Sequence, residues 1–401
     1  MSTLAGDGLT LGQADLMVEN VVGRFVLPNA MGMNFLINGQ ERVVPMVVEE
    51  PSVVAAVSNM ARLTRPAGGF HADSDASEMI GQVHVPVPEG DPESVAAALR
   101  QALPRLTAVA AAVHPRLVDR GGGVRELSVR VLRYDEPGHP AESMIVLHFV
   151  LDCVDAMGAN MVNTIAERLA PHVEDITGHR VGLRILSNLA DRRLARARVS
   201  LRPEHLASDP EQGRAVAEGI AAAWRFAWAD PYRAATHNKG VMNGIDAVAI
   251  ATGNDWRAIE AGAHAFCCRD GQYRPMTRWV IDAEGTLHGS IELPLQVGTV
   301  GGPIRVHPTV QANLRILGVE TARELAGIMA AVGLSQNLGA LRALATEGIQ
   351  QGHMRMHART VAATAGAHPS EVASVTEALV AANEFSVERA RKALEALRSR
   401  T

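Results

Sequence analysis

The chain of 401 residues carries 43 acidic and 38 basic residues, a formal net charge of −5, and is 47% apolar and 20% charged. This composition is typical of a globular protein, and the length predicts two or three domains. Charges of both signs are interspersed without a basic stripe that would follow a phosphate backbone, so nucleic acid is not an expected partner.

The sequence shows neither a membrane span nor a secretory signal. The apolar run 144–154 is interrupted by His148 and Asp152, and it falls short of the roughly 20 apolar residues that a span needs. The first 20 residues lack the basic start and apolar stretch of a signal peptide. The three cysteines suit neither a disulfide framework nor a CxxC metal site. We therefore expect a cytoplasmic protein that makes no contact with a membrane.

The first part of the chain changes its pattern near residue 78. Residues 50–63 predict a helix, because Pro51 suits a first helical turn and Val53, Val57 and Met60 have helical spacing. The next elements expected are strand 79–87, helix 91–113, a strand around 127–131, strand 144–154, helix 157–169 and strand 181–186. This βαββαβ order predicts an inserted split-βαβ (ferredoxin-like) domain over 78–190, with an antiparallel sheet and helices on one face.

The remainder is expected to be mostly helical. The predicted helices cover 211–228, 241–252, 256–267, 322–332 and 338–350, and a charged amphipathic helix ends the chain at 370–399. A hairpin is predicted over 276–282 and 287–295. The predicted fold class is therefore α+β, with a large, mainly helical domain interrupted by a small one.

One of the two lysines stands out. The 38 basic residues include only Lys239 and Lys392 as lysines, and Lys239 lies in the segment PYRAATHNKGVMN with Arg233 and Asn243. So many donors before an apolar helix suit an anionic ligand or a developing oxyanion, although a solvated turn would carry the same residues. Asp255 follows Lys239 by 16 residues, about 24 Å along a straight helix, so a shared site requires a turn in the chain or a second subunit.

Three further segments are candidates for chemistry. Glu50 precedes Pro51 at a helix start, where acids are common, and it would act as a proton donor only in an apolar setting. The turn 155–160, DAMGAN, follows a buried strand, and its backbone could approach a pyrophosphate, although it is not a GxGxxG fingerprint. His353 and His357 share a helix face, but HExxH is absent, so we expect a proton-donating histidine and no metal.

Seven motifs occur in order from about residue 18 to the C-terminal region. They are ENVVGRFVLPNAMGMNFLINGQ, VVEEPSVVAA, DAMGANMVNT, RILSNLADRRLARA, THNKGVMNGIDAVAIATGNDW, GTVGG and ATEGIQQGHM. Together they resemble the hydroxymethylglutaryl-CoA reductases, and the soluble bacterial class (class II) more than the membrane-anchored one. The position of Met1 relative to the first motif predicts a shortened N-terminal helical segment.

The resemblance implies a division of labour among domains. It implies a large domain for acyl-CoA binding and dimerisation at 1–77 and 191–347, a small nicotinamide-binding domain at 78–190, and a helical C-terminal flap at 348–401. In that family the flap closes over an active site at a dimer interface, so we expect a homodimer or an assembly of dimers.

The resemblance also implies roles for individual residues. The catalytic set falls on Glu50, Lys239, Asp255 and His353. Substrate contacts fall on Ser52, Arg233, Asn243 and Gln336. Cofactor contacts fall on Asp155, Met157, Gly158, Ala159, Asn160 and Asn188.

The implied reaction interconverts hydroxymethylglutaryl-CoA and mevalonate plus CoA, with NAD(H) or NADP(H) as cofactor and CoA as co-substrate. It takes two hydride transfers, with the mevaldyl-CoA hemithioacetal and then mevaldehyde between them. Lys239 would stabilise the oxygen that becomes negative, and Asp255 would orient Lys239. Glu50 would protonate the carbonyl oxygen, and His353 would protonate the leaving CoA thiolate.

The choice between NADH and NADPH stays open at this stage. His114, followed by Arg116 and Arg120, falls where relatives that prefer NAD carry an acidic residue for the ribose 2′-hydroxyl. A cationic neighbourhood can instead accept a 2′-phosphate, which makes NADP(H) use a hypothesis.

Two other functions compete with this interpretation. A CoA-acylating aldehyde dehydrogenase would use Cys267 or Cys268 as its nucleophile. A non-catalytic CoA-binding or nucleotide-binding scaffold would bind ligands without turnover, and it would leave the catalytic set unexplained.

Overall fold

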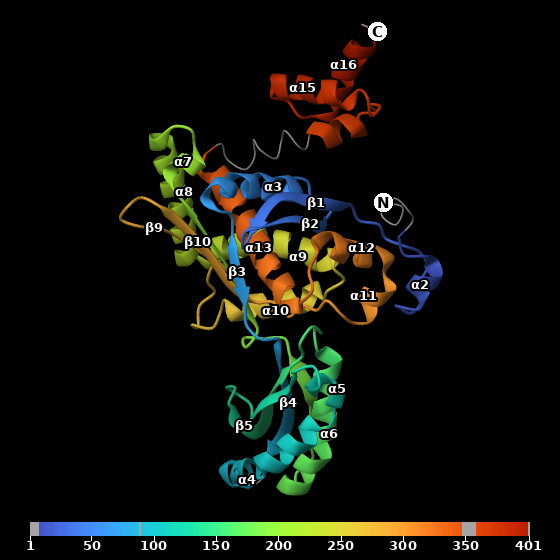
Figure 1. The fold of residues 1–401 in the computed structure, drawn as a ribbon, viewed down its shortest axis with the longest axis vertical. Coiled ribbons are helices and arrows are strands. Elements are labelled where there is room, and N and C mark those ends of the chain that lie inside the picture. Colours follow the sequence, from blue (N-terminus) through green and yellow to red (C-terminus); the bar gives the residue numbers. More distant parts are fainter. Residues whose placement is uncertain (1–7, 88–89, 347–357, 400–401) are drawn as a thin grey trace.

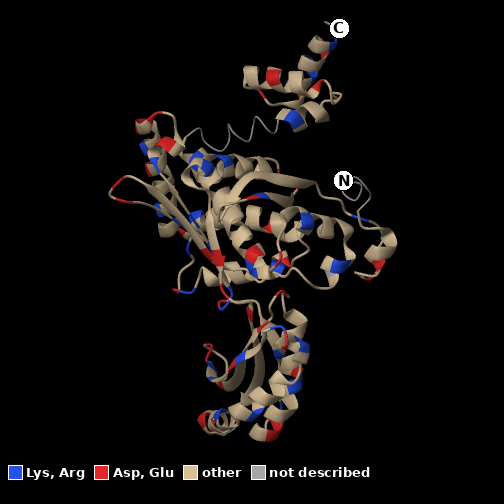
Figure 2. Cartoon of the chain, in the orientation of Figure 1, with Lys and Arg blue, Asp and Glu red and all other residues tan. Residues whose placement is uncertain are grey.

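The computed structural model describes residues 8–87, 90–346 and 358–399, which fold into three units (Figure 1). Each unit has its own apolar core. The first core draws on residues from Phe35 to Phe70 and again from Ala195 to Leu341, so its chain is interrupted. The second core lies within 79–190, in the interruption, and the third lies within 358–397. Acidic and basic residues are interspersed over all three units (Figure 2).

The small unit contains one antiparallel sheet. Its elements are β4 (Glu78–Val87), α4 (Pro92–Ala111), α5 (Pro115–Val118), β5 (Gly123–Tyr134), β6 (Glu142–Asp152), α6 (Ala159–Thr177) and β7 (Arg184–Ser187). The strand order is β5-β6-β4-β7, and α4 and α6 pack against the sheet and each other. Alternate residues of β6, such as Ile145 and Leu147, are fully buried beneath the helices. The predicted split-βαβ arrangement is confirmed.

The large unit contains more β-structure than predicted. Its strands are β1 (Asn29–Ile37), β2 (Gln40–Val47), β3 (His71–Ser74), β8 (Leu194–Leu201), β9 (Thr277–Ile281) and β10 (Leu287–Pro294). The β9–β10 hairpin is as predicted, and it extends into a four-stranded sheet of order β3-β8-β10-β9. The β1–β2 hairpin was not predicted, although Asn38 and Gly39 at its turn both have positive φ, as a type I′ turn requires.

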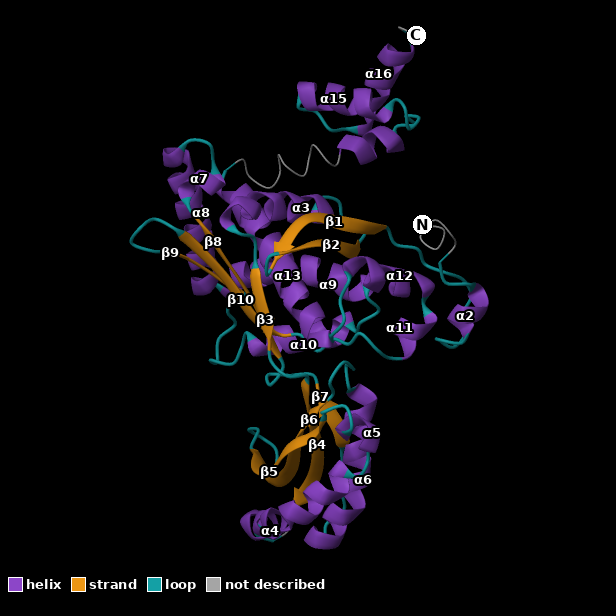
Figure 3. Ribbon diagram, viewed as in Figure 1, coloured by secondary structure: helices purple, strands orange, loops and turns teal. Residues whose placement is uncertain are grey.

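The helices of the large unit include one that lies at its centre (Figure 3). They are α2 (Leu11–Asp15), α3 (Val53–Thr64), η1 (Arg65–Ala67), α7 (Pro203–Leu206), α8 (Pro210–Ala229), α9 (Pro231–Ala251), α10 (Trp256–Phe266), α11 (Gly302–Val306), α12 (Pro308–Leu317) and α13 (Ala322–Ala345). Among the described residues, α13 alone has the length and apolarity of a membrane-spanning helix, but 67% of its apolar window is buried inside the protein. It packs against α3, α8, α9 and the sheet, so it is the core helix of this unit.

Three predicted helix boundaries were wrong. The two helices predicted at 322–332 and 338–350 form the single helix α13, in which the polar side chains of Ser335 and Asn337 are buried because they hydrogen-bond to other elements. Helix α9 begins ten residues before the predicted start at residue 241, because Asp230 caps it and Pro231 occupies its first position. The third case is the C-terminal segment.

The C-terminal unit consists of short helices instead of one long amphipathic helix. Residues 358–364 are helical, followed by α15 (Val372–Ala382) and α16 (Val387–Arg398). Asn383 ends α15 in the left-handed conformation, and the side chain of Ser386 caps α16. The break allows the two helices to pack on each other around Val375 and Leu379.

The contact between β4 and α6 leads to a prediction about stability. A Cβ atom at Gly81 would lie 2.2 Å from Phe149 Cζ and 2.7 Å from Val162 Cγ1. Gly81→Ala should therefore lower the unfolding free energy by about 1–3 kcal/mol, measured by denaturant or thermal unfolding. The control is Gly327→Ala on α13, where the new Cβ would lie 3.4 Å from Ala72 Cβ and helix propensity should favour Ala by about 1 kcal/mol. Equal stabilities of the two variants would contradict this packing.

Candidate active site

Lys239 and Glu50 form an ion pair. Glu50 lies in the turn between β2 and α3, and Lys239 lies in the third turn of α9. The Nζ atom of Lys239 donates to Glu50 Oε2 at 2.7 Å, and Asn243 Nδ2 lies 3.5 Å from the same oxygen. The lysine side chain is 62% exposed and the glutamate side chain 36%, so both are within reach of a ligand.

Helix α9 presents these side chains along one stripe. From Val241 to Ala251 every residue is buried except Asn243, Asp246 and Ile250. With Lys239 these positions are three or four residues apart, the spacing of one helix face. The rest of α9 is fixed against its neighbours, and a Cβ at Gly244 would lie 3.0 Å from Gln336 Cβ on α13. The stripe is therefore held by a rigid, close helix contact.

Two of the predicted substrate-binding residues lie near this stripe. Ser52 begins α3 with φ of 78°, a left-handed conformation that is costly for a residue with a Cβ, two residues after Glu50. Gln336 is buried on α13 beside Gly244, and its Oε1 atom has no hydrogen-bond partner among the described residues.

Arg233 lies on a different face of α9 from Lys239. The two residues are six positions apart, which places them about 120° apart around the helix axis. Arg233 is half-buried, and burial lowers the pKa of its guanidinium. Burial, with the nearby Arg233 charge, lowers the pKa of His237 to about 3, and His237 Nε2 lies 2.7 Å from Thr277 Oγ1. His237 is therefore a neutral structural residue.

Asp255 does not meet Lys239 within one chain. Helix α9 is continuous from Lys239 to Ala251, which separates these residues by about 18 Å along the axis. The carboxylate of Asp255 instead caps α10, accepting from the Ala258 backbone N–H at 3.2 Å, and lies 3.4 Å from Arg257 Nε. The Lys239–Asp255 contact that the resemblance implies is absent from the described part of a single chain, so it would require a second subunit.

The loop 296–302 joins Asp255 to the glycine-containing turn instead. Asn254, the neighbour of Asp255, exchanges two hydrogen bonds with Gly298, of 2.7 and 3.2 Å. A Cβ at Gly298 would lie 2.7 Å from Met157 N, so the loop runs directly against the turn 155–160. Asp255 therefore lies on the side of the molecule that carries the predicted cofactor residues.

The turn 155–160 is anchored to the large unit through its backbone. The Asp155 carbonyl oxygen accepts from Thr299 N at 2.9 Å, and its carboxylate accepts from Ala322 N, at the start of α13, at 3.0 Å. The fully buried Arg193 donates to Ala156 O and Met157 O, both at 3.2 Å, and also to Val297 O. Sequence reasoning did not single out Arg193, which lies within a quoted motif but carries no signal that separates it from Arg192.

The N-terminus of α6 follows this turn and has no side-chain cap. Gly158 precedes the helix with φ of 103°, and a Cβ there would lie 2.3 Å from Cys153 Sγ, so only glycine fits. Asn188 contacts the loop 296–302, because its carbonyl oxygen accepts from Gln296 Nε2 at 3.0 Å. His114 Nε2 lies 3.2 Å from Met161 O, which places His114 at the first turn of α6.

Several predicted residues take no part in the described site. His353 and His357 lie outside the described residues. Cys267 is buried, and burial raises the pKa of its thiol to about 12, which disfavours the thiolate that a nucleophile needs. Cys268 is exposed at the end of α10. The geometry thus gives little support to the aldehyde dehydrogenase alternative.

Comparison with known proteins assigns the family. The family described as hydroxymethylglutaryl-coenzyme A reductase matches residues 1–358. The 3-hydroxy-3-methylglutaryl-coenzyme A reductase of Archaeoglobus fulgidus is 47% identical over 399 residues, covering 100% of this chain and 89% of the relative. The chain belongs to the hydroxymethylglutaryl-coenzyme A reductase family.

Solved structures of this family support the same assignment. The class II 3-hydroxy-3-methylglutaryl-CoA reductase of Streptococcus pneumoniae, bound to NADPH in open conformations, has a TM-score of 0.82 and 44% identity. The alignment covers 99% of this chain and 94% of that one. A reductase named as probable from Borreliella burgdorferi is 36% identical over 350 residues, covering 86% of this chain and 77% of the relative.

One feature of this family member was not predicted from the sequence. Asp246, half-buried on the stripe of α9 that carries Lys239 and Asn243, hydrogen-bonds to the side chain of Glu260 on α10. Glu260 Oε2 lies 2.7 Å from His264 Nε2, and His264 Nδ1 lies 2.7 Å from the Tyr273 hydroxyl. Burial, and then the bond to Glu260 and its charge, raise the pKa of Asp246 to about 8.

The acid pair predicts a pH dependence of stability. The folded-state pKa of Asp246 is about 8, above its ordinary value of 3.8, so its contribution is fully present below pH 4 and is lost as the pH rises through 8. Asp246→Asn should therefore flatten the fall of unfolding free energy between pH 4 and 8. Denaturant unfolding at several pH values measures this effect, with the exposed Asp175→Asn as the control. A slope unchanged in Asp246→Asn would contradict the raised pKa of Asp246.

Proposed function

We propose that this chain catalyses the reaction after which its family is named, interconverting hydroxymethylglutaryl-CoA and mevalonate plus CoA with a nicotinamide dinucleotide. The observation that carries the proposal is the exposed Lys239 ammonium, 2.7 Å from Glu50 and on one stripe with Asn243. A cation, an acid and an amide donor that converge on one surface suit a carbonyl oxygen that gains negative charge.

Each residue of this cluster has a distinct task. Lys239 stabilises the oxygen of the thioester carbonyl, and later that of the aldehyde, as it becomes negative. Glu50 and Lys239 share a hydrogen bond, so a proton can pass from this pair to the same oxygen. Asn243 orients Glu50 and donates to the substrate. The C–S bond of the hemithioacetal breaks between the two reductions, and His353 is proposed to protonate the departing thiolate.

The residues around α6 fit a dinucleotide. The helix starts at Gly158 without a side-chain cap, so its first backbone N–H groups and its positive dipole end can face a pyrophosphate. When bound, the reduced dinucleotide supplies the hydride for each reduction. The turn 155–160 and the carbonyl of Asn188 are held by Arg193 and Gln296, which fix the backbone before the cofactor binds.

The separation of Lys239 from Asp255 supports a site shared by two subunits. In one chain, Lys239 and Glu50 lie at one end of the α9 stripe, while Asp255 lies beyond the other end, against the cofactor turn. A two-fold axis near the middle of α9 would bring the substrate half of one subunit to the cofactor half of its partner. We therefore propose a homodimer, or an assembly of dimers, in which Asp255 of one subunit contacts Lys239 of the other.

The exposed apolar segment near the N-terminus supports such an association. Leu16, Val22 and Phe25 are 86%, 100% and 92% exposed in the single chain. Contiguous apolar surface of this kind is typical of an interface with another protein chain. We propose a second copy of this chain as that partner, and a cytoplasmic location for the assembly.

Absorbance at 340 nm tests the proposed function. Purified protein with mevalonate, CoA and NAD or NADP should increase the absorbance only when CoA is present. Lys239→Ala should reduce turnover at least about a hundredfold, since it removes the charge that faces the oxyanion. Lys392→Ala is the matched control, because that lysine is 64% exposed and pairs with Glu388 on α16.

The outcomes separate the alternatives. Turnover in Lys239→Ala equal to that of the wild type would contradict the assigned role of Lys239. Binding of CoA and dinucleotide without turnover in either direction would favour the scaffold interpretation.

A further inference from the structure

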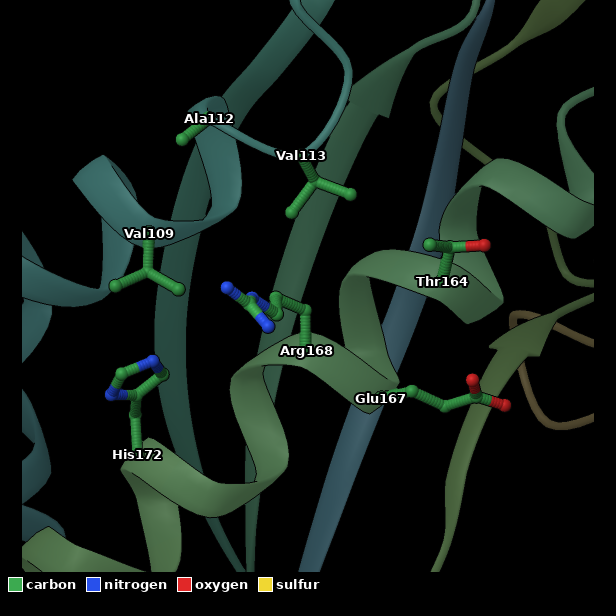
Figure 4. Close-up of a pocket in the computed structure, with 7 residues that line it drawn as sticks. All are labelled: Val109, Ala112, Val113, Thr164, Glu167, Arg168 and His172. Atoms are coloured by element: carbon green, nitrogen blue, oxygen red, sulfur yellow. The ribbon is translucent and has the colours of Figure 1, made fainter.

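The antiparallel sheet of the small unit has one face without helices. Helices α4 and α6 pack on the other face, and the side chains of Val109, Thr164 and Arg168 on these helices border a hollow on that side (Figure 4). A second pocket, of about 420 Å³, lies on the open face of the sheet. Its volume is within the range of roughly 300–1,000 Å³ that small-molecule sites occupy. The open face is therefore a candidate ligand site separate from the helix side.

The strand register places the floor of this pocket on the open face. His148 on β6 lies opposite Ser128 of β5, and Val150 on β6 lies opposite Ile80 of β4; all four residues line the pocket. Residues directly opposite each other share one face of a sheet, and successive residues of a strand alternate between faces. Phe149 belongs to the core beneath α4 and α6, so His148 and Val150 point to the other side.

The floor is apolar and is enclosed by charged side chains. Arg192 Nε lies 3.5 Å from Glu78 Oε2 on β4, and its Nη2 atom lies 3.5 Å from Glu126 Oε2 on β5. Because β6 lies between these two strands, the Arg192 side chain reaches across it. Ile80 and Val150 are only 5% and 2% exposed, although no helix packs on this face. Side chains therefore shield the floor from water.

Three polar groups of the pocket have no protein partner. Among the described residues, the side chains of Arg130 and Asp191 make no hydrogen bond or ion pair, and the buried Nδ1 atom of His148 has no hydrogen-bond partner. Burial, and then the charge of Arg130, lower the pKa of His148, so its imidazole is neutral at pH 7 and offers one donor and one acceptor. The pocket thus offers one unpaired charge of each sign beside a neutral imidazole.

A ligand that carries both charges suits this arrangement. A guanidinium binds a carboxylate through two parallel hydrogen bonds, and the Asp191 carboxylate can accept from an ammonium group. A ligand with a carboxylate alone would leave the Asp191 charge beside it without compensation. The described residues contain no cluster of three or more potential metal ligands, so the acidic side chains here do not form a metal site. The apolar floor and the 38% exposed Leu189 suit an aliphatic group on the same ligand.

We propose that this pocket binds a free α-amino acid with an aliphatic side chain, with the carboxylate on Arg130 and the ammonium group on Asp191. His148 and Ser128 supply further hydrogen bonds at the polar end, and the aliphatic side chain lies on the apolar floor. No residue of the cluster around Lys239 lines the pocket. This binding therefore requires neither the dinucleotide nor the reaction proposed above.

Titration calorimetry of the full chain with L-leucine, without dinucleotide or CoA, tests the assignment. L-leucinamide lacks the carboxylate and 4-methylpentanoate lacks the ammonium group, so each should bind at least about tenfold more weakly than L-leucine in competition calorimetry. Arg130→Gln should weaken L-leucine binding about 10- to 100-fold, to the affinity of L-leucinamide. Asp191→Asn should weaken it likewise, to the affinity of 4-methylpentanoate.

A matched pair of controls lies at the end of β5. Arg133 Nε is 3.4 Å from Asp135 Oδ2, and these side chains are 68% and 67% exposed. Neither residue lines the pocket. Arg133→Gln and Asp135→Asn should therefore bind L-leucine as the wild type does.

Three results would overturn the proposal. The first is a wild type that binds none of L-leucine, L-isoleucine and L-valine. The second is L-leucinamide or 4-methylpentanoate binding as tightly as L-leucine, which would indicate a site for one charge only. The third is undiminished L-leucine binding in both Arg130→Gln and Asp191→Asn, which would place the amino acid elsewhere. None of these results depends on turnover, so failure of the proposed function is detected separately, by absorbance at 340 nm.

Discussion

The ion pair between Lys239 and Glu50 depends on the rigidity of helix α9. The helix is buried along most of its length, and glycines at 244 and 333 allow it to approach α13 closely; a Cβ at Gly333 would lie 2.8 Å from Ile245 Cδ1. A helix fixed in this way holds the stripe that carries Lys239 and Asn243 in a constant position relative to the turn that carries Glu50. The same rigidity keeps Ala251, at the end of α9, about 18 Å along the axis from Lys239, and Asp255 follows beyond that end, so a single chain is an incomplete site.

The second constraint is the junction between the small and large units. Taking a guanidinium out of water is costly, and Arg193 is stable in its buried position because three backbone carbonyls accept its hydrogen bonds. Two of those carbonyls belong to the turn 155–160, and the third belongs to the loop 296–302, which also hydrogen-bonds to Asn254. The proposed dinucleotide position is thereby coupled to Asp255, the group proposed to complete a partner's substrate site.

Much of the fold could be predicted from local patterns. The alternating strands and amphipathic helices of 78–190 gave the correct βαββαβ order because each element buries one face. The Asn38-Gly39 pair is a recognisable hairpin turn, although no hairpin was predicted there. Asp230-Pro231 is likewise a recognisable helix start, although α9 was predicted to begin later. The union of two predicted helices into α13 could not be seen locally, because Ser335 and Asn337 look like surface residues until their partners on α3 and β9 are known.

Some residues of the candidate site could be predicted from the sequence and others could not. Glu50, Lys239 and Asn243 were selected from residue type and resemblance, and the structure brings them together. Arg193 and Asp246 were not selected, because their roles arise from burial among elements distant in sequence. The relation of Lys239 to Asp255 was left open by spacing alone, and the continuous helix explains why one chain does not bring the two together.

The most direct test of this account is the activity of a purified heterodimer of Lys239→Ala and Asp255→Asn subunits, isolated with two different affinity tags. If each site takes Lys239 from one subunit and Asp255 from the other, one of the two sites keeps both residues. The account predicts about half of the wild-type turnover per dimer, while both homodimeric variants are inactive. A heterodimer as inactive as its parents would show that both residues come from the same chain and would contradict the shared site.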